Sequence, residues 1–262
     1  MLHFIFTYIG LEICRYFGVF EKKPIEVKKV LPLCAAFCGF VSLTNVSLVY
    51  NSVGFYQLMK VLTTPMIVVI QTIWYNETFS LKIKLSLVVT CLGVAVGTVT
   101  DTEANLIGTI VSLSALLITS LYQIWVGTKQ KELECNSYQL LYYQAPISAL
   151  MLIPIVPLLD LYLPDKDPSA PPKQLTVRTD DGTIPAIIVS SCLAFLVNLS
   201  IFLVIGKTSP VTYNVLGHFK LCVILSLGFL FFGNSVDVKN LMGIGLTLVG
   251  VFWYTHLKQT KQ

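Results

Sequence analysis

The sequence predicts an all-α, polytopic transmembrane helical bundle, and three observations support this fold class. First, 55% of the 262 residues are apolar and 12% are charged, with a mean hydropathy of +0.74. Second, apolar segments of roughly 20 residues recur along the chain, each long enough to cross about 30 Å of hydrocarbon. Third, lysine and arginine gather in alternate connections between these segments. Because a soluble domain of this length would be less apolar, we expect one membrane domain over residues 1–262.

Nine segments are predicted to span the membrane. They cover residues 2–20, 30–50, 54–76, 83–99, 105–128, 139–162, 184–205, 210–233 and 239–257. Basic residues follow the first segment, so it is interpreted as a span and not as a cleavable signal peptide. Pro65 interrupts the third, and residues 160–183, rich in proline, aspartate and lysine, form a predicted flexible loop. The eighth begins with Ser209 as a capping serine and Pro210 at the first helical position.

The distribution of basic residues predicts the orientation of the chain. If the connection after the first span is cytosolic, alternation places twelve basic residues on the cytosolic side and four on the other. The twelve are Arg15, Lys22, Lys23, Lys28, Lys29, Lys82, Lys84, Lys129, Lys131, Lys207, Lys258 and Lys261. The four are Lys166, Lys173, Arg178 and Lys239. This excess follows the positive-inside rule, so the C-terminus is expected in the cytosol.

The chain also matches itself when it is shifted by 157 residues. The matched pairs are Ser52 with Ser209, Tyr56 with Tyr213, Lys82 with Lys239, Thr90 with Thr247, and Gly93-Val94 with Gly250-Val251. The related spans are five apart, and an odd separation reverses their direction across the membrane. Residues 1–100 and 105–257 are therefore predicted to form inverted repeats of the five-helix kind found in secondary transporters.

The two predicted repeats differ in their number of spans. The second contains five and the first only four, which predicts that the first repeat lacks its initial helix. A natural protein of nine spans is the alternative interpretation.

Two lysines in the middle of apolar segments are the strongest functional signal. A lysine near the bilayer centre costs about 2.5–3.5 kcal/mol, so such a residue usually faces a polar cavity. Tyr56 stands four residues before Lys60, and Tyr213 stands seven before Lys220, on the same helical faces. Two buried cations beside hydroxyl groups predict a site for a small anion at the membrane midplane.

The strings around these lysines resemble a known family. Asn45-Val-Ser-Leu, Ser52-Val-Gly-Phe-Tyr-Gln-Leu-Met-Lys60 and Ser209-Pro-Val-Thr-Tyr-Asn-Val-Leu-Gly-His-Phe-Lys220 are similar to signatures of the nucleotide-sugar and triose-phosphate translocators. These carriers form part of the drug/metabolite transporter superfamily, and the chain looks most like the E-subgroup orphans of solute carrier family 35. The resemblance implies ten spans, a lysine at Lys220 that contacts substrate phosphate, and Lys60 in the same cavity.

Departures from the family signatures bear on the substrate. Carriers of GDP-linked sugars have Gly-Ala-Leu-Asn before the lysine, where this chain has Leu-Gly-His-Phe before Lys220. Plastid phosphate exchangers follow that lysine with an arginine, where Leu221 stands here. The resemblance therefore favours a nucleotide sugar, UDP-linked rather than GDP-linked, over a small phosphorylated sugar.

The predicted substrate-binding set combines charge, aromatic rings and neutral hydrogen-bonding groups. It comprises Lys60, Lys220, Tyr56, Tyr213, Gln57, Thr63, Thr64, Asn45, Asn198, Asn214, Tyr142, Tyr143 and Gln144. His218 is interpreted as a packed, neutral histidine, and Glu12 as the partner of Arg15 in an internal ion pair. Without a chain of carboxylates for proton coupling, exchange of one anion for another is the expected mechanism. No catalytic group, metal site, cofactor or nucleic-acid partner is predicted.

The functional hypothesis is an antiporter in the Golgi or endoplasmic reticulum membrane. It would exchange a nucleotide sugar for a nucleoside monophosphate by alternating access, with membrane lipid around it. One alternative is an exchanger of phosphorylated sugars or other organic phosphates. Another is a truncated, non-transporting isoform that pairs with a full-length carrier. Gly93-x-x-x-Gly97 permits close helix packing, either in a homodimer or inside the bundle.

Overall fold

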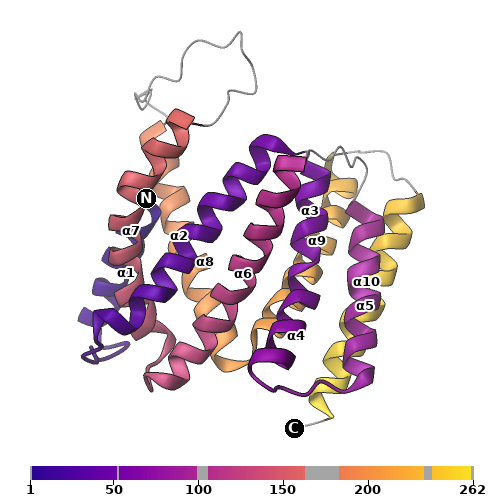
Figure 1. Ribbon diagram of the computed structural model, residues 1–262, viewed down its shortest axis with the longest axis horizontal. Helices are drawn as coiled ribbons and strands as arrows, with labels where there is room; N and C mark the ends of the chain where they lie inside the picture. The colour runs from indigo at the N-terminus through magenta and orange to yellow at the C-terminus, as the bar shows by residue number, and fades with distance from the viewer. Residues whose placement is uncertain (1, 52, 99–105, 163–182, 233–237, 261–262) are drawn as a thin grey trace.

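The computed structural model shows an all-α bundle, which confirms the predicted fold class (Figure 1). It describes residues 2–51, 53–98, 106–162, 183–232 and 238–260. The helices are α1 (Leu2–Tyr16), α2 (Val27–Tyr50), α3 (Val53–Val61), α4 (Thr63–Trp74), α5 (Leu81–Thr98), α6 (Leu106–Glu132), α7 (Ser137–Tyr162), α8 (Thr183–Lys207), α9 (Pro210–Phe232) and α10 (Val238–Gln259). Most of the predicted loop 160–183 lies outside the described residues, as do Lys166, Lys173 and Arg178.

The third predicted span is not one continuous helix but the pair α3 and α4. Pro65 has no N–H to donate to the carbonyl of Val61, and the chain turns at Leu62 before the α4 ladder resumes with Met66 N–H donating to Leu62 O at 3.1 Å. The released Val61 carbonyl lies 3.8 Å from the thiol of Cys91 on α5. The break at Leu62 therefore leaves the last carbonyl of α3 with a thiol as its partner.

The start of α9 agrees with the sequence prediction. The Ser209 hydroxyl accepts a hydrogen bond from the Thr212 backbone N–H at 3.2 Å, and Pro210 is the first helical residue. The cap fixes where α9 begins. The positions of Tyr213, Asn214, Gly217 and Lys220 along the helix follow from it.

Four helices within the described part of the chain are long and apolar enough to cross a membrane by length and composition. They are Val27–Tyr50, Leu106–Glu132, Ser137–Leu159 and Ile184–Lys207, and Met59–Trp74 is a shorter apolar stretch. The outer surface is apolar as well: Leu193 and Phe252 have 57% and 65% of their surface exposed. The chain is a multi-pass membrane protein, and the number of nine spans stays a prediction.

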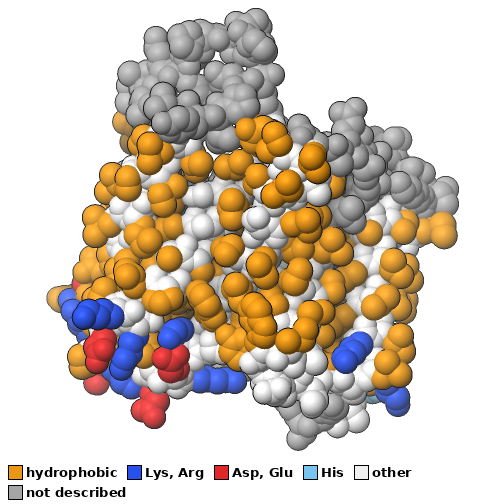
Figure 2. Space-filling view, viewed as in Figure 1, with side chains coloured by type: hydrophobic (Ala, Val, Ile, Leu, Met, Phe, Trp, Pro, Cys, Tyr) orange, Lys and Arg blue, Asp and Glu red, His pale blue; other side chains and the backbone are white. Residues whose placement is uncertain are grey.

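Charged side chains gather at one end of the bundle. Figure 2 shows lysines, arginines and acidic residues of the described part at the lower end of this face, below a broad apolar surface. The connections α1–α2 and α6–α7 and the last turn of α10 lie at this end (Figure 1). The end of α10 therefore lies at the same end of the bundle as the basic connections that the sequence assigned to the cytosolic side.

Two apolar clusters hold the bundle together, and α6 belongs to both. One includes Leu11, Leu33 and Leu140 from α1, α2 and α7. The other includes Ile67, Val211 and Val251 from α4, α9 and α10. Helix α6 contributes Tyr122 and Val126 to the first and Ile124 to the second. Because successive residues of a helix point in different directions, α6 stands between the two clusters.

Helices α5 and α10 pack along each other at one edge of the bundle (Figure 1). A Cβ added to Gly93 would come within 3.0 Å of Thr247, and a Cβ added to Gly250 would come equally close to Thr90. These are the residues that the 157-residue shift matches, Thr90 with Thr247 and Gly93 with Gly250. The matched residues thus contact each other in reciprocal pairs.

Candidate functional site

A cavity of about 540 Å³, with charged, hydroxyl and amide groups set in a largely apolar wall, lies among α2, α3, α4, α6, α8 and α9. Its wall includes both lysines of the apolar segments, Lys60 from α3 and Lys220 from α9. Neither forms an ion pair with a carboxylate among the residues that the structure describes. The Lys60 ammonium lies 6.0 Å from the centre of the Tyr56 ring. The cavity therefore carries two positive charges that an anion can neutralise.

Six of the predicted substrate-binding residues line this cavity. They are Lys60, Lys220, Tyr56, Tyr213, Thr63 and Asn214. Two more stand behind the wall and hold residues that line it. Thr64 is fully buried and its hydroxyl hydrogen-bonds the His218 imidazole Nε2 at 2.9 Å. The Gln144 amide donates to the Tyr122 hydroxyl at 3.1 Å.

Four of the predicted residues point elsewhere. Asn45 is exposed and donates to the Val41 carbonyl of its own helix. Asn198 donates to the Thr7 hydroxyl of α1 at 3.3 Å. Tyr142 donates to Glu12 of α1, and Tyr143 donates to the Lys23 carbonyl in the α1–α2 connection. Gln57 belongs to α3, but its side chain lies outside the described part.

The cavity also includes residues that sequence reasoning did not select. On α6 these are Ser112, Thr119, Tyr122 and Gln123. Their spacings of seven, three and one residues keep them near one face of the helix, so the helical period offered a signal. The other such polar residues are Thr44 and Ser47 of α2 and His218 of α9.

Aromatic rings form part of the cavity wall. Phe40 of α2 stacks on Tyr122 with ring centroids 5.2 Å apart and planes inclined by 24°. Tyr213 of α9 lines the same cavity. Such rings can stack on a flat heterocycle. The two lysines can bind the charged group of an anion, and these rings can stack on a base attached to it.

At the C-terminal end of α2, buried hydroxyl and amide groups join this helix to α6. The hydroxyls of Ser47 and Ser112 lie 2.6 Å apart, and the Asn51 amide donates to Ser112 at 3.0 Å. All three residues are at most 5% exposed. These bonds fix the part of α2 that contributes Thr44 and Ser47 to the cavity.

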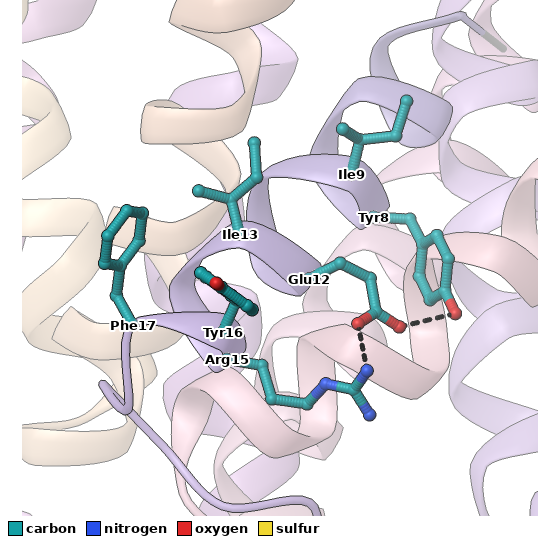
Figure 3. A pocket seen from close by; sticks show the side chains of 7 residues that line it. All are labelled: Tyr8, Ile9, Glu12, Ile13, Arg15, Tyr16 and Phe17. Atoms are coloured by element: carbon teal, nitrogen blue, oxygen red, sulfur yellow. Dashed lines mark hydrogen bonds and ion pairs between the residues drawn. The ribbon is translucent and has the colours of Figure 1, made fainter.

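A second, shallower groove lies on the outside of α1 (Figure 3). Glu12 accepts a hydrogen bond from the Tyr8 hydroxyl at 2.9 Å and pairs with Arg15 at 2.5 Å. It also accepts a hydrogen bond from Tyr142 of α7. The predicted ion pair between Glu12 and Arg15 is confirmed, but it is partly exposed rather than internal, with 29% and 42% of the two side chains exposed. The cluster ties α1 to α7.

Replacing Glu12 with glutamine is expected to weaken the contact between α1 and α7. The neutral amide leaves Arg15 without its partner and weakens the bonds from two tyrosines, at a cost of about 1 kcal/mol. A lower Tm of the purified protein checks this expectation. Glu132→Gln, which breaks an exposed pair with Lys129, is the matched control and is expected to leave Tm unchanged. Equal effects of the two changes would contradict the assignment.

Comparison with known proteins decides the family. Residues 2–255 match the model of the Triose-phosphate Transporter family. The chain belongs to this family. Similar proteins from Arabidopsis thaliana include UDP-xylose transporter 2, 37% identical over 254 residues that cover 97% of this chain and 70% of the relative. UDP-rhamnose/UDP-galactose transporter 1 is 33% identical over 253 residues, which cover 97% and 71%.

The match confirms the resemblance that the signatures around Lys60 and Lys220 indicated. The members and relatives are transporters, so the prediction of a carrier and not an enzyme is confirmed as well.

Proposed function

We propose that this chain carries a nucleotide sugar, UDP-linked, in exchange for a nucleoside monophosphate. The observation that carries the proposal is the cavity, where Lys60 and Lys220 stand together with aromatic rings and amide groups. Lysine is a compact cation that can hold a phosphate and release it again. The names of the similar proteins, transporters of UDP-xylose and of UDP-rhamnose or UDP-galactose, support the uridine nucleotide.

Exchange follows from the charges of the cavity. An empty cavity with two uncompensated cations would reorient across the membrane only at a high cost in free energy. A bound anion on both the inward and the return step lowers this cost. The reciprocal contacts between α5 and α10 support inverted repeats, 1–100 and 105–257, which would rock against each other in alternating access.

The proposal includes the location and orientation of the carrier. We place it in the Golgi or endoplasmic reticulum membrane with its C-terminus in the cytosol. The charged end of the bundle, which also holds the last turn of α10, supports this orientation (Figures 1 and 2).

Counterflow in proteoliposomes tests the exchange. Vesicles loaded with UMP are expected to take up labelled UDP-xylose or UDP-galactose faster than vesicles loaded with GMP or CMP, or left empty. Equal uptake into empty vesicles would contradict exchange. Uptake driven by organic phosphates but by none of the nucleotides would favour the alternative exchanger instead.

A further inference from the structure

An amide pair inside the cavity has an orientation that its hydrogen bonds determine. Gln123 of α6 and Asn214 of α9 both line the cavity. The Asn214 side-chain nitrogen donates to Gln123 Oε1 at 2.5 Å and to the Pro210 carbonyl at 2.9 Å. A backbone carbonyl can only accept, so the nitrogen of Asn214 must face Pro210 and its oxygen must face away.

The same reasoning fixes Gln123. Its oxygen accepts from Asn214, so its amide nitrogen is left to donate elsewhere. Within the described part of the chain, neither Asn214 Oδ1 nor Gln123 Nε2 has a hydrogen-bond partner, although both residues line the cavity. The pair thus leaves one acceptor and one donor without a partner in the protein.

The surroundings of this pair suit a nucleobase. Tyr122 precedes Gln123 and stacks on Phe40, while Tyr213 precedes Asn214, and all of them line the cavity. Lys220 is on the same helix as Asn214, six residues later, which is about 9 Å along the axis. That separation leaves room for a ribose between a base at Asn214 and a phosphate at Lys220.

We propose that Gln123 and Asn214 recognise the imide edge of uracil. The base N3–H donates to Asn214 Oδ1, and the base carbonyl O4 accepts from Gln123 Nε2. Cytosine in the same orientation would set its N3 acceptor against the Asn214 oxygen and its amine against the Gln123 nitrogen. Guanine carries a further amino group that needs an additional acceptor. This inference rests on the proposed function and names the residues that select the base.

The test is the ligand-induced rise in Tm of the purified full chain, measured over a range of UMP, CMP, GMP and ribose 5-phosphate concentrations. The wild-type chain is expected to bind UMP more tightly than CMP or GMP. Gln123→Glu turns the free donor into an acceptor, so UMP affinity is expected to fall about 10- to 100-fold. CMP, whose amine then meets an acceptor, should gain relative to UMP. Ribose 5-phosphate, which lacks a base, should lose less affinity than UMP, because only the repulsion between its phosphate and the new carboxylate acts on it.

The matched control is Gln130→Glu, the same change made seven residues further along α6. Gln130 is buried outside the cavity and donates to the Phe202 carbonyl at 3.1 Å. It is expected to lower Tm without changing the order of the nucleotides. If Gln123→Glu fails to fold, Gln123→Met removes the donor with similar length and should lose the preference for UMP.

Three results would overturn this inference. In the first, the Gln123 variants lose every ligand equally, which would make the pair a structural link between α6 and α9. In the second, they keep the wild-type preference for UMP. In the third, the wild-type chain itself responds to no nucleotide, which would also overturn the proposed function and is recognised without any variant.

Discussion

Replacing Lys220 with alanine is expected to abolish nucleotide-driven uptake. The ammonium lines the cavity without a carboxylate partner among the described residues, so it is available to a phosphate. Losing one charge-assisted bond weakens binding by about 10- to 100-fold. Lys60→Ala on α3 should act in the same direction. Counterflow uptake and the nucleotide-induced rise in Tm are the two measurements.

Stability separates loss of binding from loss of folding. Removing a cation from an apolar segment relieves a desolvation cost, so Tm without ligand is expected to stay equal or to rise. Lys220→Arg keeps the charge and should retain more binding than Lys220→Ala. Lys129→Ala, at the charged end of α6 and paired with Glu132, is the control that should leave uptake unchanged. Normal uptake by both cavity variants would exclude the lysines from the substrate site.

The sequence allowed the helical membrane fold to be predicted because long apolar segments have few alternatives in lipid. It also located the two lysines, since a cation in such a segment must face something polar. The start of α9 at Ser209 and Pro210 was predictable from local chemistry. The exact break near Pro65 was harder, because a proline can bend a helix or end it.

The rotation of each helix about its axis could not be predicted equally well. Helix α8 is apolar nearly all round, so no polar face shows which of its sides meets the cavity. Asn198 was therefore expected in the site, whereas it contacts Thr7 of α1. Gln123 was missed for a related reason. The helical period grouped it with Ser112 and Thr119 on one face of α6, but its role becomes visible only with its partner Asn214 on another helix.

Replacing Gly93 or Gly250 with leucine is expected to cause the largest loss of stability. A Cβ at Gly93 would meet the Thr247 backbone nitrogen, and one at Gly250 would meet backbone atoms of Thr90, all within 3.0 Å. Backbone cannot rotate away as a flexible side chain can, so α5 and α10 would have to separate. Overpacking of this kind costs about 1–3 kcal/mol or more. A fall in Tm and in the yield of folded protein in detergent checks this expectation.

Gly245 offers a control on the same helix. Gly245 lies between Gly243 and Gly250 in α10 and is exposed. A Cβ added there would have no atom of another residue within 4 Å. Gly245→Ala should therefore keep or raise Tm, because alanine favours the helix by about 1 kcal/mol. If Gly93 and Gly250 occupy equivalent positions in the contact between α5 and α10, Gly93→Ala and Gly250→Ala should lower Tm by similar amounts. A large effect at one glycine and none at the other would show that α5 and α10 do not share this contact symmetrically.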